Sequence, residues 1–376
     1  MIAQISRAKG VARLKNGQLR IRSLRARALA VPMRRPLQTS TGAVSVAPLV
    51  LLDLETSGGI TGRAYLFAIS AGHLRPIVAL LQSMSEVVKN DALAPYEIER
   101  KLRARYTLLG VHNIVLFAMA GIDMCAWDAL GQALGQPLVR LLGGESRPVA
   151  AYNSNGLGIQ NLKALAKEAE ALAEGFSAVK LRLGRPEAKA DLEALRAVKR
   201  AIGPQVTLMV DFNQALTAAE AVRRGRMIDE EGGVLWIEEP VRADDFAGCA
   251  RVAREVATPI QIGENFMGPE QMAQALAAGS CDYAMPDAQR IGGVTGWMRA
   301  AALAQAAGVE MSSHLFPEAS AQLLAVTPTC HWLEYVDWAN PVLREPARIE
   351  KGRVVLPARP GLGMQWDEKA VRRYAL

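Results

Sequence analysis

Three short apolar runs in this sequence each end in a carboxylate, at Asp211, Glu238 and Glu264. The runs read VTLMVD, VLWIE and IQIGE, and each interval between them contains a helix-like segment rich in Ala, Arg and Glu. A strand, a turn, a helix and a return turn in a βα unit take roughly 25–30 residues, which is close to the spacing of the three acids. We therefore predict that these acids stand at the C-terminal ends of three successive parallel strands.

Carboxylates that converge in this way repel one another unless a cation neutralises them. Hard divalent cations such as Mg²⁺ prefer oxygen ligands of this kind. The trio therefore predicts a metal site with Asp211, Glu238 and Glu264 as ligands and Mg²⁺ as the cofactor. The alternative is that the acids cap the helices that follow them, where Asp and Glu are common. Capping explains one acid easily and three acids in phase poorly.

Five further ionisable residues stand at the ends of other strand-like runs. Lys180 and Arg182 are two apart, so both side chains point to the same side, and crowded cations are expected to lower the pKa of the lysine. Asp287 lies on the strand next to that of His314, where it would hold the Nδ1 proton and make the histidine a base. Glu334 is a second acid of the site or a proton donor to substrate, with a rim salt bridge as the alternative. A metal that binds the carboxylate of a substrate, together with a base next to it, is suited to the formation of an enediolate.

The elements that must position these residues alternate between strand and helix from residue 149 to residue 336. This alternation predicts a closed parallel barrel with its active site at the C-terminal strand ends. Before the barrel, residues 21–31, 48–55 and 60–68 predict an antiparallel meander, residues 32–47 a loop, and residues 74–142 a helical region. The predicted organisation is a disordered extension (1–20), an α+β domain (21–143), the barrel (144–340) and a C-terminal segment that returns to the first domain (341–376).

The composition excludes several classes of protein. Half of the residues are hydrophobic and 22% are charged, so the chain can bury a large core. The sequence contains no run of 18 or more apolar residues, which is the length that a membrane-spanning helix needs. The basic residues that give the net charge of +7 are scattered along the chain. We therefore predict no membrane and no nucleic-acid partner. Four widely spaced cysteines without a CxxC pattern predict buried free thiols in a reducing cytoplasm.

Several motifs resemble one family, the enolase superfamily and its mandelate racemase subgroup (mandelate racemase/muconate lactonizing enzyme-like proteins). They are VKLRLG, LMVDFNQ, WIEEP, IQIGEN, AMPDAQRIGGVTGW, MSSHLFPE and HWLEYVDW. The resemblance runs from about residue 21 to the end of the chain. It implies an α/β fold with a modified TIM barrel, (β/α)7β, and an N-terminal α+β capping domain. It also implies Mg²⁺, a small-molecule carboxylate substrate and a homo-oligomer, often an octamer.

The resemblance also implies a role for each candidate residue. The metal ligands would be Asp211, Glu238 and Glu264, and the general base would be the dyad of Asp287 and His314. Residues at the substrate carboxylate would be Lys180, Asn213 and Glu334, of which Glu334 matches the acid that hydrogen-bonds the carboxylate.

The chain departs from mandelate racemase in two places. Arg182 stands where the racemase pattern has a lysine as the base for the second face, which puts two-sided proton transfer in doubt because arginine is a poor base. The predicted lid loop is polar, with Arg34, Arg35, Gln38 and residues 39–41 where the racemase has apolar residues. The alternative for the two arginines is that they point to solvent.

We therefore predict an Mg²⁺-dependent enzyme that removes the α-proton of a 2-hydroxy carboxylate. Arg182 and the polar lid favour a dehydratase of an acid sugar (a hydro-lyase). One alternative is a mandelate racemase-like racemase or epimerase of a 2-hydroxy acid. Another is a non-catalytic homologue that binds a metal and a carboxylate without turnover.

Overall fold

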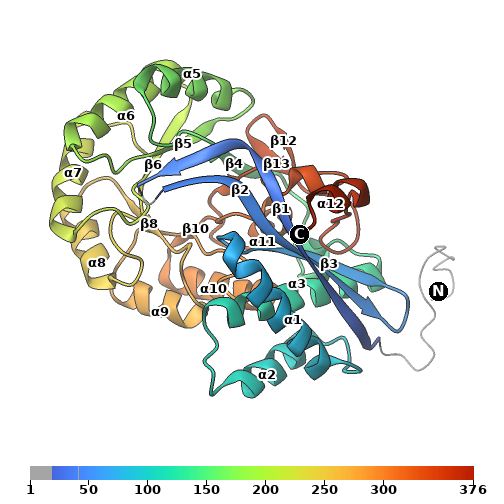
Figure 1. Cartoon of the computed structure of the whole chain (residues 1–376). Helices are drawn as coiled ribbons and strands as arrows, with labels where there is room; N and C mark the ends of the chain where they lie inside the picture. Colours follow the sequence, from blue (N-terminus) through green and yellow to red (C-terminus); the bar gives the residue numbers. More distant parts are fainter. Residues whose placement is uncertain (1–18, 41) are drawn as a thin grey trace, which may run out of the picture.

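The computed structural model describes residues 19–40 and 42–376 (Figure 1). A three-stranded sheet and a group of helices form one part of the molecule, and a ring of helices around parallel strands forms the other. The predicted disordered extension lies outside the described residues except at Leu19 and Arg20. For these two residues the prediction is wrong, because Leu19 is buried and its carbonyl accepts a 2.8 Å hydrogen bond from Leu93 N.

The predicted meander is present as β1 (Ile21–Thr39), β2 (Gly42–Thr56) and β3 (Thr61–Phe67), which pair antiparallel in the order β1-β2-β3. The prediction of a loop over residues 32–47 is wrong. Both strands continue through it as a long hairpin, which Figure 1 shows reaching across the ring of helices. A register shift between Pro32 and Leu37 absorbs the two prolines as a bulge, and the buried side chains of Met33 and Leu37 stabilise the extension.

The helical region predicted for residues 74–142 contains three long helices and a short one, and a further short helix, η1 (Ala71–His73), precedes it. The helices of the region are α1 (Leu74–Val88), α2 (Pro95–Tyr106), α3 (Asn113–Leu134) and α4 (Leu138–Leu141). Helix α3 is long and apolar enough to cross a membrane by length and composition alone, but 89% of its apolar window is buried inside the protein. It is packed as a core helix. All four cysteines are free, although Cys281 and Cys330 are only half-buried.

The predicted barrel is present, and among the described residues it has eight parallel strands and seven connecting helices. The strands are β4 (Val149–Asn153), β5 (Ala178–Arg182), β6 (Thr207–Asp211), β7 (Ile237–Glu238), β8 (Ile260–Ile262), β9 (Tyr283–Ala284), β10 (Glu310–Met311) and β11 (Leu333–Tyr335). The helices are α5 (Leu162–Ala173), α6 (Ala188–Ile202), α7 (Ala218–Glu231), α8 (Phe246–Glu255), α9 (Pro269–Ala277), α10 (Gly293–Ala307) and α11 (Pro317–Ala325). Pairing of β11 with β4 brings the last strand beside the first.

The C-terminal segment contacts both parts of the molecule. It contains η2 (Asn340–Val342), β12 (Arg348–Glu350), β13 (Arg353–Val355) and α12 (Glu368–Tyr374). Strand β13 pairs antiparallel with the start of β4. Farther along, Ala375 forms a bridge with Leu29 of β1, and the Trp366 indole donates a 2.8 Å hydrogen bond to Asp53.

A buried carboxylate joins α3 to α10. Asp123 accepts hydrogen bonds from the backbone N and the hydroxyl of Thr295, and burial raises its pKa to about 7. An unfolded aspartate titrates near 4. Because the folded pKa lies above the unfolded one, the stability from this group is complete below about pH 4 and is lost as the pH rises through about 7.

We therefore predict that Asp123→Asn changes the slope of stability against pH. Between pH 5 and pH 8 the variant should gain about 2 kcal/mol relative to the native chain, whatever constant cost the amide imposes. Urea unfolding at several pH values measures the difference. If plots of the free energy of unfolding against pH were parallel for the two proteins, the prediction would be wrong.

Candidate active site

The predicted site residues lie around one end of the barrel, where the strands terminate. Arg182 and Asp211 are register partners at the ends of β5 and β6, and Asp211 is in turn the partner of Glu238 at the end of β7. The later strands are shorter than predicted, so Glu264, Asp287 and His314 lie two or three residues beyond β8, β9 and β10. Because a bridge joins Asp287 to His314, the loops keep these residues at the same end of the barrel.

Lys180 lies at the centre of the acidic cluster. Its ammonium donates to Glu238 and to Glu334 (2.8 Å) and lies 3.2 Å from Asp211. The prediction of a lowered lysine pKa is wrong. Burial opposes the charge, but Glu238 and Glu334 raise the pKa of Lys180 well above its usual value, so this residue is a fixed cation.

In this arrangement the carboxylates of the three predicted metal ligands do not lie close enough together to bind one metal ion. Across residues 19–40 and 42–376, no three His, Cys, Asp or Glu side chains form a group tight enough to hold a metal ion as they stand. The reason is that the Lys180 ammonium contacts both Asp211 and Glu238, while Glu264 lies beside His314, with 3.3 Å from Oε2 to Nε2. A bound cation would have to compete with both contacts.

The donor set nevertheless fits a hard divalent cation. The buried acids of the cluster are Asp211, Glu238, Glu239, Asp287 and Glu334, with Glu264 partly exposed, against the buried cations Lys180 and Arg182 and the histidine. Burial raises the pKa of Glu238 to about 8 despite Lys180, and Asp211 adds to the rise, so the cluster lacks positive charge. The buried Oδ1 of Asn213 also has no hydrogen-bond partner. Oxygen donors with excess negative charge suit Mg²⁺.

The predicted dyad of His314 and Asp287 is formed. Nδ1 of His314 lies 2.7 Å from Oδ2 of Asp287, whose Oδ1 accepts hydrogen bonds from Gln289 N and Arg290 N. This arrangement orients the ring and leaves Nε2 beside Glu264, at 3.3 Å from Oε2. Burial lowers the pKa of His314, but Glu264, Glu334 and Asp287 together raise it to about 9.

Glu334 is an ionised acceptor here. Its carboxylate accepts hydrogen bonds from Lys180 and from the Ser154 hydroxyl (2.7 Å) on Oε1, and from Leu315 N (2.9 Å) on Oε2. Burial raises the pKa of Glu334, but Lys180 and His314 lower it far more. The predicted role as a proton donor requires this carboxylate to take up a proton, which its contact with the Lys180 ammonium opposes.

Arg182 is buried and makes no ion pair with an acid among the described residues. Nη1 donates to the carbonyls of Ser154 and Gly156 (3.1 and 2.9 Å), and Nη2 donates to the Ser154 hydroxyl. Nε has no hydrogen-bond partner, and none of the ion pairs among the described residues includes this guanidinium. A guanidinium used as a hydrogen-bond donor offers no lone pair to a substrate proton.

The predicted polar lid is the far part of the β1–β2 hairpin. The Gln38 carbonyl accepts a 2.8 Å hydrogen bond from Ile159 N, which fastens the hairpin to the loop after β4. Arg34 is exposed and Arg35 is half-buried, 4.0 Å from Glu168. Burial raises the pKa of Asp337 beyond β11, and the charges of Arg35 and Arg34 partly offset this rise. Thr41 lies outside the described residues.

The sequence reasoning missed two polar residues of the site. Ser154 links Arg182 to Glu334 and is fully buried. It follows β4, the one strand for which we expected no functional residue at its end. Glu239 is buried beside the metal acids and accepts hydrogen bonds from Asn265 (2.7 Å) and Gln214 (3.1 Å). The doubled acid in WIEEP was the signal that could have revealed it.

Comparison with known proteins shows the family. Residues 22–143 match the mandelate racemase / muconate lactonizing enzyme N-terminal domain, and residues 164–370 match the enolase C-terminal domain-like family. Together these matches cover most of the chain. The protein therefore belongs to the enolase superfamily, in the mandelate racemase/muconate lactonizing enzyme group.

Three relatives illustrate the range of the family. The structure of an enolase from alpha proteobacterium bal199 with bound Mg is 45% identical, with a TM-score of 0.93 over 95% of this chain and 100% of that one. An enolase from Bradyrhizobium, complexed with magnesium and mandelic acid, is 40% identical, with a TM-score of 0.92 over 96% and 99% of the chains. The L-talarate/galactarate dehydratase of Salmonella typhimurium is 29% identical over 86% of this chain and 82% of its own length. Other relatives include acid-sugar dehydratases and epimerases.

Proposed function

We propose that this protein is an Mg²⁺-dependent dehydratase of an acid sugar. It removes the α-proton of a 2-hydroxy carboxylate through an enediolate and expels the β-hydroxyl as water. The observation that carries this proposal is Arg182, which donates hydrogen bonds to Ser154 and Gly156 and has no lone pair to offer. A site with one base, His314, suits elimination, whereas a racemase needs a base on each face of the α-carbon.

The charged residues have two separate roles at the substrate carboxylate, which are metal binding by the acids and charge stabilisation by Lys180. Asp211, Glu238 and Glu264 would hold Mg²⁺, which supplies Lewis-acid stabilisation of charge on the carboxylate oxygens. The Lys180 ammonium, now held by Glu238 and Glu334, adds a second fixed cation at the same place. Negative charge that develops on the substrate therefore meets groups that are already oriented.

His314 moves the protons. With Glu264 neutralised by the bound cation, the pKa of His314 would fall, and Nε2 would then accept the α-proton while Asp287 holds Nδ1 and stabilises the imidazolium. The C–H electron pair enters the enediolate and returns as the bond between the α- and β-carbons becomes double and the β-carbon–oxygen bond breaks. The imidazolium gives its proton to the departing hydroxyl, which leaves as water. The resulting enol becomes a 2-keto acid.

Racemisation of a 2-hydroxy acid is the second candidate function. Its support is the relative from Bradyrhizobium, which was crystallised with mandelic acid, a compound that has no β-hydroxyl to eliminate. The third reading, a homologue that binds without turnover, has less support because the His314–Asp287 pair is formed at 2.7 Å.

A substrate panel tests the proposal. The protein is incubated with Mg²⁺ and a series of acid sugars, and 2-keto acids are assayed. We expect at least one acid sugar to give a keto product. If none does, while a 2-hydroxy acid exchanges its α-proton in D₂O, the protein is a racemase.

Arg182→Lys tests the one-base argument directly. A lysine buried at this position, where Arg182 makes no ion pair within the described residues, can lose its proton because burial disfavours its charge, so it can serve the second face. We expect the variant to incorporate deuterium with inversion at the α-carbon, which the native enzyme does not, while dehydration falls about tenfold. NMR of the recovered substrate measures both. Arg196→Lys, on an exposed part of α6, is the control, and inversion by the native enzyme would refute the argument.

We also propose that the enzyme is a cytoplasmic homo-oligomer without a nucleic-acid or membrane partner. The free thiols of all four cysteines support a reducing compartment. Light scattering of the purified protein tests the oligomeric state.

A further inference from the structure

Strand β3 is an edge strand of the capping sheet, and among residues 19–40 and 42–376 no strand pairs with its outer side. At Phe67 a side chain of the barrel fills that place. Phe67 N donates to Oε1 of Gln289 (2.9 Å), and Nε2 of Gln289 donates to Phe67 O (3.1 Å). The glutamine amide therefore pairs with β3 as another strand would.

Gln289 also belongs to the turn that orients the proposed base. It is 2% exposed, and its backbone N donates a 2.8 Å hydrogen bond to Oδ1 of Asp287. The other oxygen of Asp287 lies 2.7 Å from Nδ1 of His314. A continuous set of short hydrogen bonds therefore runs from the capping sheet through Gln289 and Asp287 to the imidazole.

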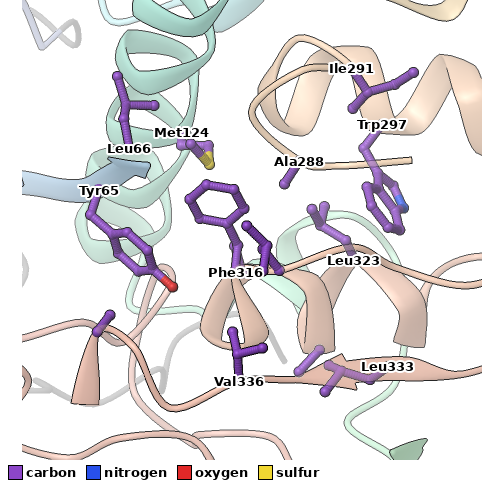
Figure 2. Close-up of a cluster of buried hydrophobic side chains, with 14 of the residues drawn as sticks. Tyr65, Leu66, Met124, Ala288, Ile291, Trp297, Phe316, Leu323, Leu333 and Val336 are labelled. Carbon is purple, nitrogen blue, oxygen red and sulfur yellow. The ribbon is translucent and has the colours of Figure 1, made fainter. Parts of the chain in front are cut away.

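The same strand holds the other half of the dyad through Tyr65, two residues before Phe67 and on the same side of β3. The Tyr65 hydroxyl donates a 2.8 Å hydrogen bond to Glu318 at the start of α11, and its ring lies 5.1 Å from that of Phe316. Figure 2 shows these two rings side by side between the capping domain and the barrel. All three side chains are buried.

The turn between His314 and α11 needs such support. Leu315 and Phe316 have φ values of +48° and +50°, which are left-handed conformations that bulky residues rarely adopt. Strained backbone of this kind persists only where the surroundings hold it. The contacts of Tyr65 with Phe316 and Glu318 help to stabilise this turn, which directly follows His314.

We infer that β3 of the capping domain positions the Asp287–His314 dyad, with Gln289 and the Tyr65–Glu318 pair as positioning residues. The base is then completed by the docking of the capping domain and is not a property of the barrel alone. The inference rests on the proposed function only where turnover is concerned, because the geometry of the dyad can be observed without a substrate.

The first test compares two glutamines. Gln322 is a matched control for Gln289, since it is fully buried and also holds backbone by two hydrogen bonds, from Val139 N and to Gly361 O (both 3.0 Å). We expect Gln289→Ala and Gln322→Ala to lower the melting temperature by similar amounts. Only Gln289→Ala should disturb the dyad.

The state of the dyad is read by NMR of ¹⁵N-histidine protein. The chain has four histidines, and the hydrogen-bonded Nδ1 proton of His314 is assigned by its loss in His314→Asn. We expect this signal to shift upfield or exchange away in Gln289→Ala and to persist in Gln322→Ala. An unchanged signal in Gln289→Ala would overturn the inference, whether or not an acid-sugar substrate is found.

Turnover and rescue provide the second test, on whichever acid the enzyme converts. In Gln289→Ala and Tyr65→Phe we expect kcat to fall at least tenfold with KM within twofold, since a misplaced base slows chemistry more than binding. Glu318→Gln keeps an acceptor for Tyr65 and should retain activity and the Nδ1 signal, whereas Glu318→Ala should lose both. Equal behaviour of the two Glu318 variants would refute the role of Tyr65.

Discussion

Replacement of His314 by asparagine is expected to lower kcat by about 10³-fold or more, because the variant loses the side chain that we propose as the base. Exchange of the substrate α-proton with D₂O should disappear together with product formation. KM should stay within about threefold, since the carboxylate is held by other residues. Single-turnover and NMR exchange assays at saturating substrate measure both effects.

The control for this experiment is His112→Asn, the same substitution at an exposed histidine of the capping domain. It should leave both rates unchanged. If His314→Asn eliminated water slowly but kept rapid exchange, His314 would be the acid for the leaving group and another residue would remove the proton. Unchanged exchange and unchanged elimination would exclude the dyad from the chemistry altogether.

The second large effect is expected for Glu238→Gln. Glu238 is fully buried and contacts Lys180, and the substitution removes a carboxylate that a bound cation would hold in its ionised form. We expect the affinity for Mg²⁺ to fall at least 100-fold, by analogy with the loss of a charged ligand from any hard-cation site. Isothermal titration with Mg²⁺ measures this without reference to activity.

Thermal unfolding gives an independent measure of the same binding. A ligand present at about 100 times its Kd stabilises the folded state by about 2.7 kcal/mol, so Mg²⁺ should raise the melting temperature of the native protein. The rise should be absent in Glu238→Gln and present in Glu270→Gln, which changes an exposed acid at the start of α9. Equal Mg²⁺ responses in the two variants would mean that the metal lies elsewhere.

The hydrophobic periodicity and the spacing of the acids carried most of the prediction of the fold. The alternation of strands and helices predicted the barrel because parallel strands that are buried on both faces read as short apolar runs. The continuation of β1 and β2 through residues 32–47 was missed for a physical reason. Pro32, Pro36 and Gly42 are loop signals in isolation, and only the bulge and the packing of Leu37 make the strands continue.

The site was predicted unevenly. Phase along the strands located every candidate at one end of the barrel, because consecutive parallel strands present their C-terminal residues together. The protonation states of the site residues could not be predicted in this way. The pKa of Lys180 is raised and that of Glu334 is lowered because the two charges meet at 2.8 Å. Nothing in the linear spacing of residues 154 positions apart predicts such a contact.

What the sequence determined by itself is the chemistry that is available: three acids in phase, a histidine with an aspartate one strand away, and an arginine in place of a second lysine. These follow from residue type and period, which are local properties. Only the tertiary structure decided how that chemistry is held. The Arg182 guanidinium donates hydrogen bonds to the carbonyls of Ser154 and Gly156. The His314–Asp287 dyad is connected through Gln289 to strand β3, which lies more than 200 residues earlier in the chain. Contacts between distant segments depend on packing, which no short motif encodes.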